Sequence, residues 1–166
     1  MIVLGVDPGT AATGYGVVDR GAAGTLRLVE CGVIRPKAGA TLAVRLQAIF
    51  EELSALIARH GPDALAVESV FVARNVRSAL VLGHARGVIL LAAAQAGLDV
   101  AEYPPATIKK AVVGAGAATK VQVQQMVARI LRLQSPPEPS DAADGVAVAL
   151  THAMRSGRVL RRAVVG

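Results

Sequence analysis

The chain has 166 residues, of which 53% are hydrophobic and 18% are charged, and its formal net charge is +6 at pH 7. This composition excludes a disordered protein, and the length fits one domain. The lone Cys31 excludes an internal disulfide, and no spacing of cysteine and histidine fits a zinc site. No signal-peptide pattern opens the chain, and the longest uncharged run, Gly87 to Leu98, is too short to span a membrane. We therefore expect a cytoplasmic protein with no membrane partner, whose positive charge favours phosphate-bearing partners.

In chain order, the first predicted elements are strands at about 2–7, 14–18 and 25–34, which form an antiparallel meander. Apolar residues between 42 and 57 then recur at helical spacing, with Thr41 as the N-cap and Gly61 at the end. A short buried strand is predicted at 64–68.

The next predicted helix, over 75–96, is apolar nearly all round, so both of its sides should be covered. Gly83 and Gly87 share one face and permit close approach of another helix. A second copy of the chain is the simplest partner for that face, so we expect a homodimer.

The remaining predicted elements are an edge strand at 98–102, a short helix at 106–112, a helix at 119–133 capped by Thr119, and a last helix from Ser140 to about Met154. This order predicts an α/β fold, a mixed five-stranded sheet flanked by helices on both faces. We expect a single domain over 1–166, in which the basic tail of about 156–166 is a candidate flexible segment.

Four carboxylates stand beside apolar runs, where an unpaired charge is costly. Asp7 and Glu68 end predicted strands, and Asp141 and Asp144 share one face of the first turn of a helix. Each has a local alternative: a turn for Asp7, a helix cap for Glu68, and the helix dipole for the pair. One divalent-metal site explains all four together, because Mg²⁺ prefers carboxylate oxygen. Two such ions can hydrolyse a phosphodiester bond.

Several segments, in order along nearly the whole chain, resemble one known family. They are Gly5-Val-Asp7-Pro-Gly-Thr10 with Gly14-Tyr-Gly16, Val67-Glu-Ser-Val-Phe71-Val-Ala-Arg-Asn75, Ala79-Leu, Leu82-Gly-His-Ala-Arg-Gly87, Ile108-Lys-Lys-Ala-Val-Val-Gly-Ala-Gly116, Lys120-Val-Gln-Val-Gln124, and Asp141-Ala-Ala-Asp144 with Ala149-Leu-Thr-His152. The family is RuvC, the bacterial Holliday-junction endonucleases, or crossover junction endodeoxyribonucleases.

The resemblance implies a ribonuclease H-like nuclease domain that works as a homodimer. It implies paired, symmetric nicks across four-way junction DNA in recombination and DNA repair, by two-metal phosphodiester hydrolysis. The implied cofactor is Mg²⁺, two ions per subunit, with Mn²⁺ as a substitute. A branch-migration complex that moves the junction is a further implied partner.

The resemblance also implies the site residues. The metal-binding and catalytic acids would be Asp7, Glu68, Asp141 and Asp144, with Lys120 as a further catalytic residue. Family members vary at position 141, where some carry His. The implied DNA contacts are Phe71, Arg74, Asn75, Arg77, Lys109, Lys110 and Lys120.

Local alternatives to the DNA contacts remain open at this point. Phe71 is either a core residue or a wedge that stacks on a base near the crossover. Arg74 and Asn75 either start a helix or contact DNA. Gly114 and Gly116 either make a turn or let the backbone approach a phosphate.

Three other functions compete with the junction endonuclease. The segment Asp7-Pro-Gly-Thr10 also resembles the phosphate loop of sugar kinases and actin-like ATPases, although those proteins need two such domains around a nucleotide. A second alternative is a non-catalytic junction-binding protein, which the intact carboxylates disfavour. A third is a related nuclease that acts on RNA or another branched DNA.

Overall fold

The computed structural model describes residues 1–69 and 76–163, with side chains described as far as Ser156. Its centre is a five-stranded mixed sheet with the strand order β3-β2-β1-β4-β5. The first three strands pair antiparallel, and β4 and β5 continue the sheet in parallel with β1. This confirms both the predicted meander and the predicted edge strand. The strands are β1 (Ile2–Asp7), β2 (Thr13–Arg20), β3 (Leu26–Ile34), β4 (Ala64–Glu68) and β5 (Asp99–Tyr103).

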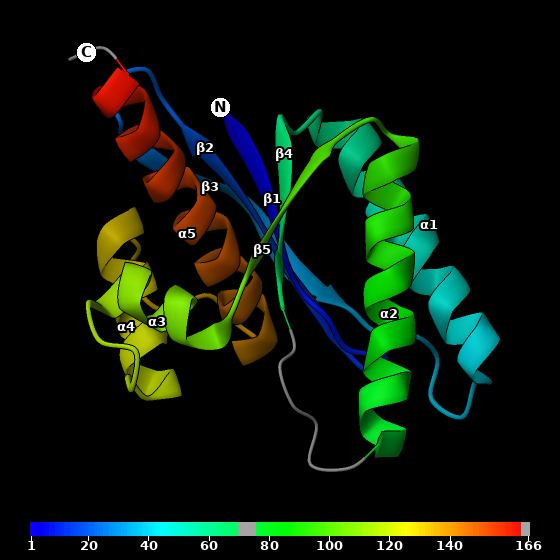
Figure 1. Ribbon diagram of the computed structural model, residues 1–166. Coiled ribbons are helices and arrows are strands. Elements are labelled where there is room, and N and C mark those ends of the chain that lie inside the picture. The colour runs from blue at the N-terminus through cyan, green and yellow to red at the C-terminus, as the bar shows by residue number, and fades with distance from the viewer. Residues whose placement is uncertain (70–75, 164–166) are drawn as a thin grey trace.

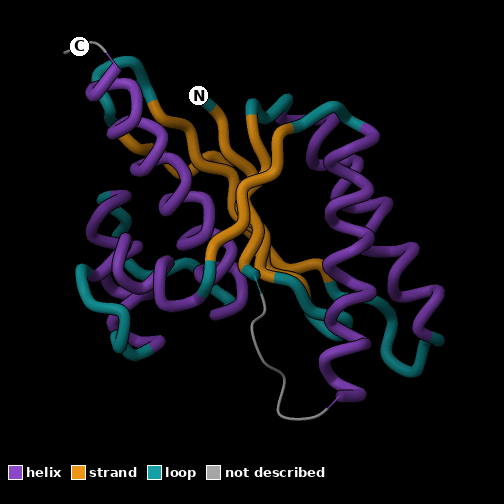
Figure 2. Tube along the Cα trace, in the orientation of Figure 1, coloured by secondary structure: helices purple, strands orange, loops and turns teal. Residues whose placement is uncertain are grey.

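Helices cover both faces of the sheet, as Figures 1 and 2 show. One face packs against α1 and α2, and the other against α3, α4 and α5. Successive strand residues enter opposite layers: Val3 lies in the core with α5, and Leu4 lies in the core with α1. The helices are α1 (Leu42–His60), α2 (Val76–Gln95), α3 (Pro105–Val113), α4 (Lys120–Leu131) and α5 (Ser140–Ala163).

The helix caps follow the sequence signals. Thr41 Oγ1 accepts a hydrogen bond from the Val44 amide at the start of α1, and Gly61 ends the helix in the left-handed conformation. Thr119 and Gln122 form a reciprocal capping box at the start of α4.

The last helix differs from the prediction, because α5 continues past Met154 to Ala163. The pair Ser156 and Gly157 reads as a stop signal in sequence. However, a glycine inside a helix costs only about 1 kcal/mol relative to alanine. The Ser156 hydroxyl donates to the carbonyl oxygen of His152 at 2.9 Å, inside the helix, so the serine does not end it.

The described residues of the single chain cover only one side of α2. Ala85 and Ile89 are buried against the core, whereas Leu80 is 61% exposed and Leu91 is 51% exposed. A Cβ added at Gly83 would meet no atom of the described residues within 4 Å. By length and composition alone, α2 could also cross a membrane, a criterion that core helices of globular proteins also meet. The side of α2 predicted to need a partner is therefore uncovered by the described residues of the single chain.

Candidate functional site

Two of the predicted acids lie side by side because their strands are parallel neighbours. Val6 of β1 pairs with Val67 of β4, and each is followed by the acid that ends its strand. Parallel strands end at the same edge of a sheet, so Asp7 and Glu68 come together although 61 positions separate them in the chain.

Glycines bring α5 directly onto the same strands. A Cβ at Gly5 would lie 2.4 Å from the carbonyl oxygen of Gly145, and a Cβ at Gly145 would lie 2.5 Å from the Cα of Tyr15. A Cβ at Gly14 would lie 1.8 Å from the carbonyl oxygen of Asp141. Since Cβ atoms essentially never approach that closely, only glycine permits this packing. The motif glycines thus place the first turns of α5, with their acids, over the ends of β1 and β2.

Three of the four predicted acids face one cavity of about 330 Å³. Asp7 enters it from β1, Glu68 from β4 and Asp144 from α5, with two lysines beside them. The described residues that line it are Asp7, Glu68, Pro105, Ile108, Lys109, Lys120, Val123, Asp144 and Ala147.

The electrostatics of this cavity are those of crowded, buried carboxylates. Burial, followed by repulsion from Glu68 and Asp144, raises the pKa of Asp7 to about 8. Burial also raises the pKa of Glu68 and of Asp144 above their ordinary values. Protonated Asp7 donates a hydrogen bond to Glu68. This hydrogen bond favours the charged form of Glu68. Three acids of this kind attract a cation strongly.

Lys120 supplies one positive charge to the cluster. Its Nζ lies 2.6 Å from Oδ2 of Asp144, and this hydrogen bond raises the pKa of Lys120. Lys120 is the first residue of α4, where a positive charge opposes the helix dipole. The bond to Asp144 offsets that unfavourable position and fixes Lys120 inside the site.

Asp141 lies at the rim rather than in the cavity. Its carboxylate is 3.9 Å from Lys120 Nζ and 3.9 Å from a guanidinium nitrogen of Arg35, which follows β3. Asp141 is not among the residues that line the cavity, and its side chain is 36% exposed. Three predicted acids therefore converge, and the fourth stands one helical turn away.

The donor set fits a hard divalent cation, because all three converging side chains offer carboxylate oxygen. Within residues 1–69 and 76–163, no three acids, histidines or cysteines lie close enough together to hold one ion unaided. Lys120 holds one oxygen of Asp144. A metal shell here would include water or DNA phosphate, as Mg²⁺ sites commonly do.

The predicted DNA contacts lie at different places in the structure. Lys109 lines the carboxylate cavity, whereas Lys110 lines a different cavity on the other side of α3. Arg77 is exposed in the first turn of α2. Phe71, Arg74 and Asn75 lie outside the described residues.

The sequence left two contributions near the site unassigned. Arg35 approaches Asp141, although nothing in the sequence links the two. A 2.9 Å hydrogen bond joins Tyr103 Oη to His152 Nδ1 and ties α5 to the end of β5, beside Glu68. The motif containing His152 marked the residue, but its partner depends on the fold.

Comparison with known proteins identifies the family. A family model described as crossover junction endodeoxyribonuclease RuvC matches residues 3–152. The chain belongs to the RuvC family. A relative from Pelotomaculum thermopropionicum named crossover junction endodeoxyribonuclease RuvC is 54% identical over 153 residues, which cover 92% of this chain and 93% of the relative.

Solved RuvC structures have the same fold as this chain. The structure of Thermus thermophilus RuvC matches with a TM-score of 0.85 and 38% identity, covering 95% of this chain and 97% of the other. The same protein in complex with a Holliday junction substrate matches with a TM-score of 0.87 and 35% identity, covering 95% and 96%.

These matches confirm several predictions. The fold is ribonuclease H-like, and the enzyme is a crossover junction endodeoxyribonuclease, a hydrolase of phosphodiester bonds. Its function is the resolution of Holliday junctions in DNA recombination and repair. RuvC enzymes are metal-dependent nucleases.

Proposed function

We propose that Asp7, Glu68 and Asp144 form the catalytic centre of this RuvC enzyme and bind two Mg²⁺ ions per subunit, with Mn²⁺ as a substitute. The observation that carries this proposal is the convergence of these three acids, from β1, β4 and α5, on one cavity. Their raised pKa values support it, because burial and neighbouring acids disfavour the charged carboxylates, and a bound divalent cation would favour them.

Each residue of the site then has a proposed role. Bound Mg²⁺ supplies Lewis-acid chemistry and a water of lowered pKa. Asp7 interacts with both of the other acids, because Glu68 and Asp144 each raise its pKa. Lys109 and Lys120 bring positive charge to the scissile phosphate. Asp141 assists from the rim through its contact with Lys120.

The proposed substrate is four-way junction DNA, cut by paired symmetric nicks. The net charge of +6 supports binding to a polyanion. We propose that Phe71 stacks on a base near the crossover and that the basic residues hold phosphates around it. The proposed DNA contacts are Phe71, Arg74, Asn75, Arg77, Lys109, Lys110 and Lys120.

We further propose a homodimer built on the uncovered side of α2. Leu80 and Leu91 are more than half exposed there, and Leu46, Gly83 and Gly87 line an apolar cavity of about 500 Å³ beside them. A two-fold interface presents two active sites in a symmetric relation, which suits paired nicks.

We also propose that residues 1–166 form a single nuclease domain. The enzyme acts in the cytoplasm together with a branch-migration complex.

The substitution Glu68→Gln tests the assignment of the site. It keeps the size of the side chain and removes its charge, so junction binding should persist while Mg²⁺-dependent nicking falls by about 100-fold or more. Glu52→Gln on the exposed face of α1 is the matched control and should nick normally. Full cleavage by the Glu68→Gln variant, at any Mg²⁺ concentration, would refute the assignment.

A further inference from the structure

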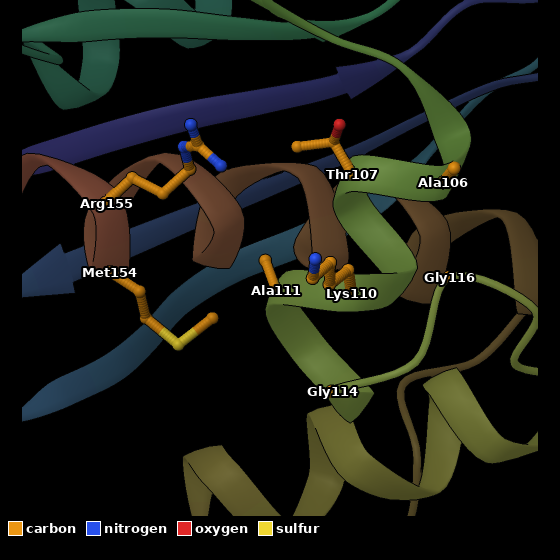
Figure 3. Close-up of a pocket in the computed structure, with 8 residues that line it drawn as sticks. All are labelled: Ala106, Thr107, Lys110, Ala111, Gly114, Gly116, Met154 and Arg155. Carbon is orange, nitrogen blue, oxygen red and sulfur yellow. The ribbon is translucent and has the colours of Figure 1, made fainter.

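A second cavity, of about 760 Å³, lies on the other side of α3 from the carboxylates. Figure 3 shows the residues around it, which come from α3, from the loop after it and from α5. Such a volume is typical of a small-molecule or nucleotide subsite. Among the residues that line it are Thr107, Lys110, Ala111, Gly116, Met154 and Arg155.

The charge of this cavity has one sign. Lys110 and Arg155 both line it, and none of its described lining residues is an acid. Neither cation forms an ion pair with another described residue. Some other basic side chains of the chain are paired with acids, such as Arg59 with Glu30 and Arg86 with Glu102. Two cations that line one cavity without a described counter-charge favour an anionic ligand.

The cations of the cavity come from separate elements that the core holds in place. Arg155 lies 5.8 Å over the ring of Tyr103, which limits where its guanidinium can point. Lys110 projects from α3, whose Ile108 and Val112 are buried against α5. The hydroxyl of Thr107 adds a donor for the same ligand.

The two cavities share α3 as a common wall. Lys109 lines the carboxylate cavity, and the next residue, Lys110, lines the second one. An α-helix with its side chains is roughly 10–12 Å across. Because one DNA strand advances roughly 3.4 Å along the helix axis per nucleotide, that width corresponds to about three nucleotides.

We infer that this second cavity holds a backbone phosphate of the cleaved strand, about three nucleotides from the scissile phosphate, and that Lys110, Arg155 and Thr107 bind it. The inference rests on the proposed junction substrate and adds Arg155 and the cavity to it. Arginine suits the role because its guanidinium binds phosphate oxygens in pairs. The contact would hold the strand on both sides of α3 and fix its register over the acids.

The first test measures the salt dependence of binding to a four-way junction in EDTA, so that cleavage plays no part. For the Lys110→Met/Arg155→Met double variant, we expect weaker binding and a salt slope that is shallower by about 0.9 for each cation removed. The double variant Lys110→Arg/Arg155→Lys keeps both charges and should keep the slope. Equal melting temperatures of all variants establish that they fold.

Arg129→Met is the control for general charge, because Arg129 is exposed on α4 and lines neither cavity. Its slope should change by less than half as much as that of the Lys110→Met/Arg155→Met variant. An equal change for each cation removed would overturn the inference, as would an unchanged slope in the double variant. If the unmodified protein fails to bind the junction, the proposed function itself fails, which is a different result.

The second test uses junctions that carry one uncharged methylphosphonate at successive positions. We expect a loss of affinity about three nucleotides from the scissile phosphate, and this loss should vanish in the Lys110→Met/Arg155→Met variant. Inorganic phosphate alone should bind the cavity weakly and compete with the junction. Binding of inorganic phosphate at Lys110 without any such competition would assign the cavity to a free anion and overturn the inference.

Discussion

The substitution Asp7→Asn should make the metal-free protein more stable at neutral pH while it abolishes nicking. In the folded state the pKa of Asp7 is about 8, against an ordinary value of 3.8. As pH rises above 3.8, the unfolded chain loses this proton and the folded chain keeps it, so the free energy of unfolding falls. At pH 7 the difference from 3.8 is about 3 pH units, which corresponds to about 4 kcal/mol. The Asp7→Asn variant avoids this loss, and its amide can still donate to Glu68.

Urea unfolding in EDTA from pH 4 to pH 9 measures the effect. The variant and the unmodified protein should be equally stable near pH 4 and diverge steadily up to about pH 8. Asp19→Asn, a surface acid paired with Arg27 and the N-terminus, is the control and should change stability by less than about 1 kcal/mol. Added Mg²⁺ should stabilise only the protein that keeps Asp7, by about 2.7 kcal/mol at a hundredfold excess over Kd. A variant that is no more stable at pH 7 would refute the crowding of the three acids.

Three further outcomes follow from the packing. Gly5→Ala forces a Cβ to within 2.2 Å of the Ala149 amide nitrogen, so the free energy of unfolding measured in urea should fall by about 1–3 kcal/mol. Nicking should fall about 100-fold because α5 shifts, and normal nicking would contradict the packing. Asp144→Asn should reduce the nicking rate at least about tenfold more than Asp141→Asn, because only Asp144 lines the cavity; equal losses would place both in it. Leu80→Asp should leave stability nearly unchanged but yield a monomer in sedimentation, and a persistent dimer would exclude the α2 face.

Much of the fold could be predicted because its signals are local. The N-caps Thr41 and Thr119 and the terminator Gly61 each act within a few residues, and each lies at the predicted helix boundary. The pairing of Asp7 with Glu68 was also predictable, since strands that run parallel end at one edge.

Other features depend on contacts between distant segments, which local patterns do not report. The rim position of Asp141 depends on Arg35 and Lys120, which come from two other parts of the chain. The second cavity takes Lys110 from α3 and Arg155 from α5, which are 45 positions apart in the chain. The predicted end of the last helix near Met154 was wrong, because Ser156 and Gly157 are accommodated within α5.

The motif glycines link the fold to the chemistry. Gly5 lets α5 pack directly on β1, and Gly145 lets it pack on β2, at separations no side chain would allow. That close packing brings Asp144 near two acids that end their own strands. Burial of Asp7, together with repulsion from Glu68 and Asp144, destabilises the metal-free protein. A divalent cation removes the same repulsion when it binds. The free energy of this relief contributes to the affinity of the site for the cation. Relaxing the glycine contacts should therefore weaken metal binding and bring the pKa of Asp7 closer to its ordinary value, although the lost packing itself destabilises the fold.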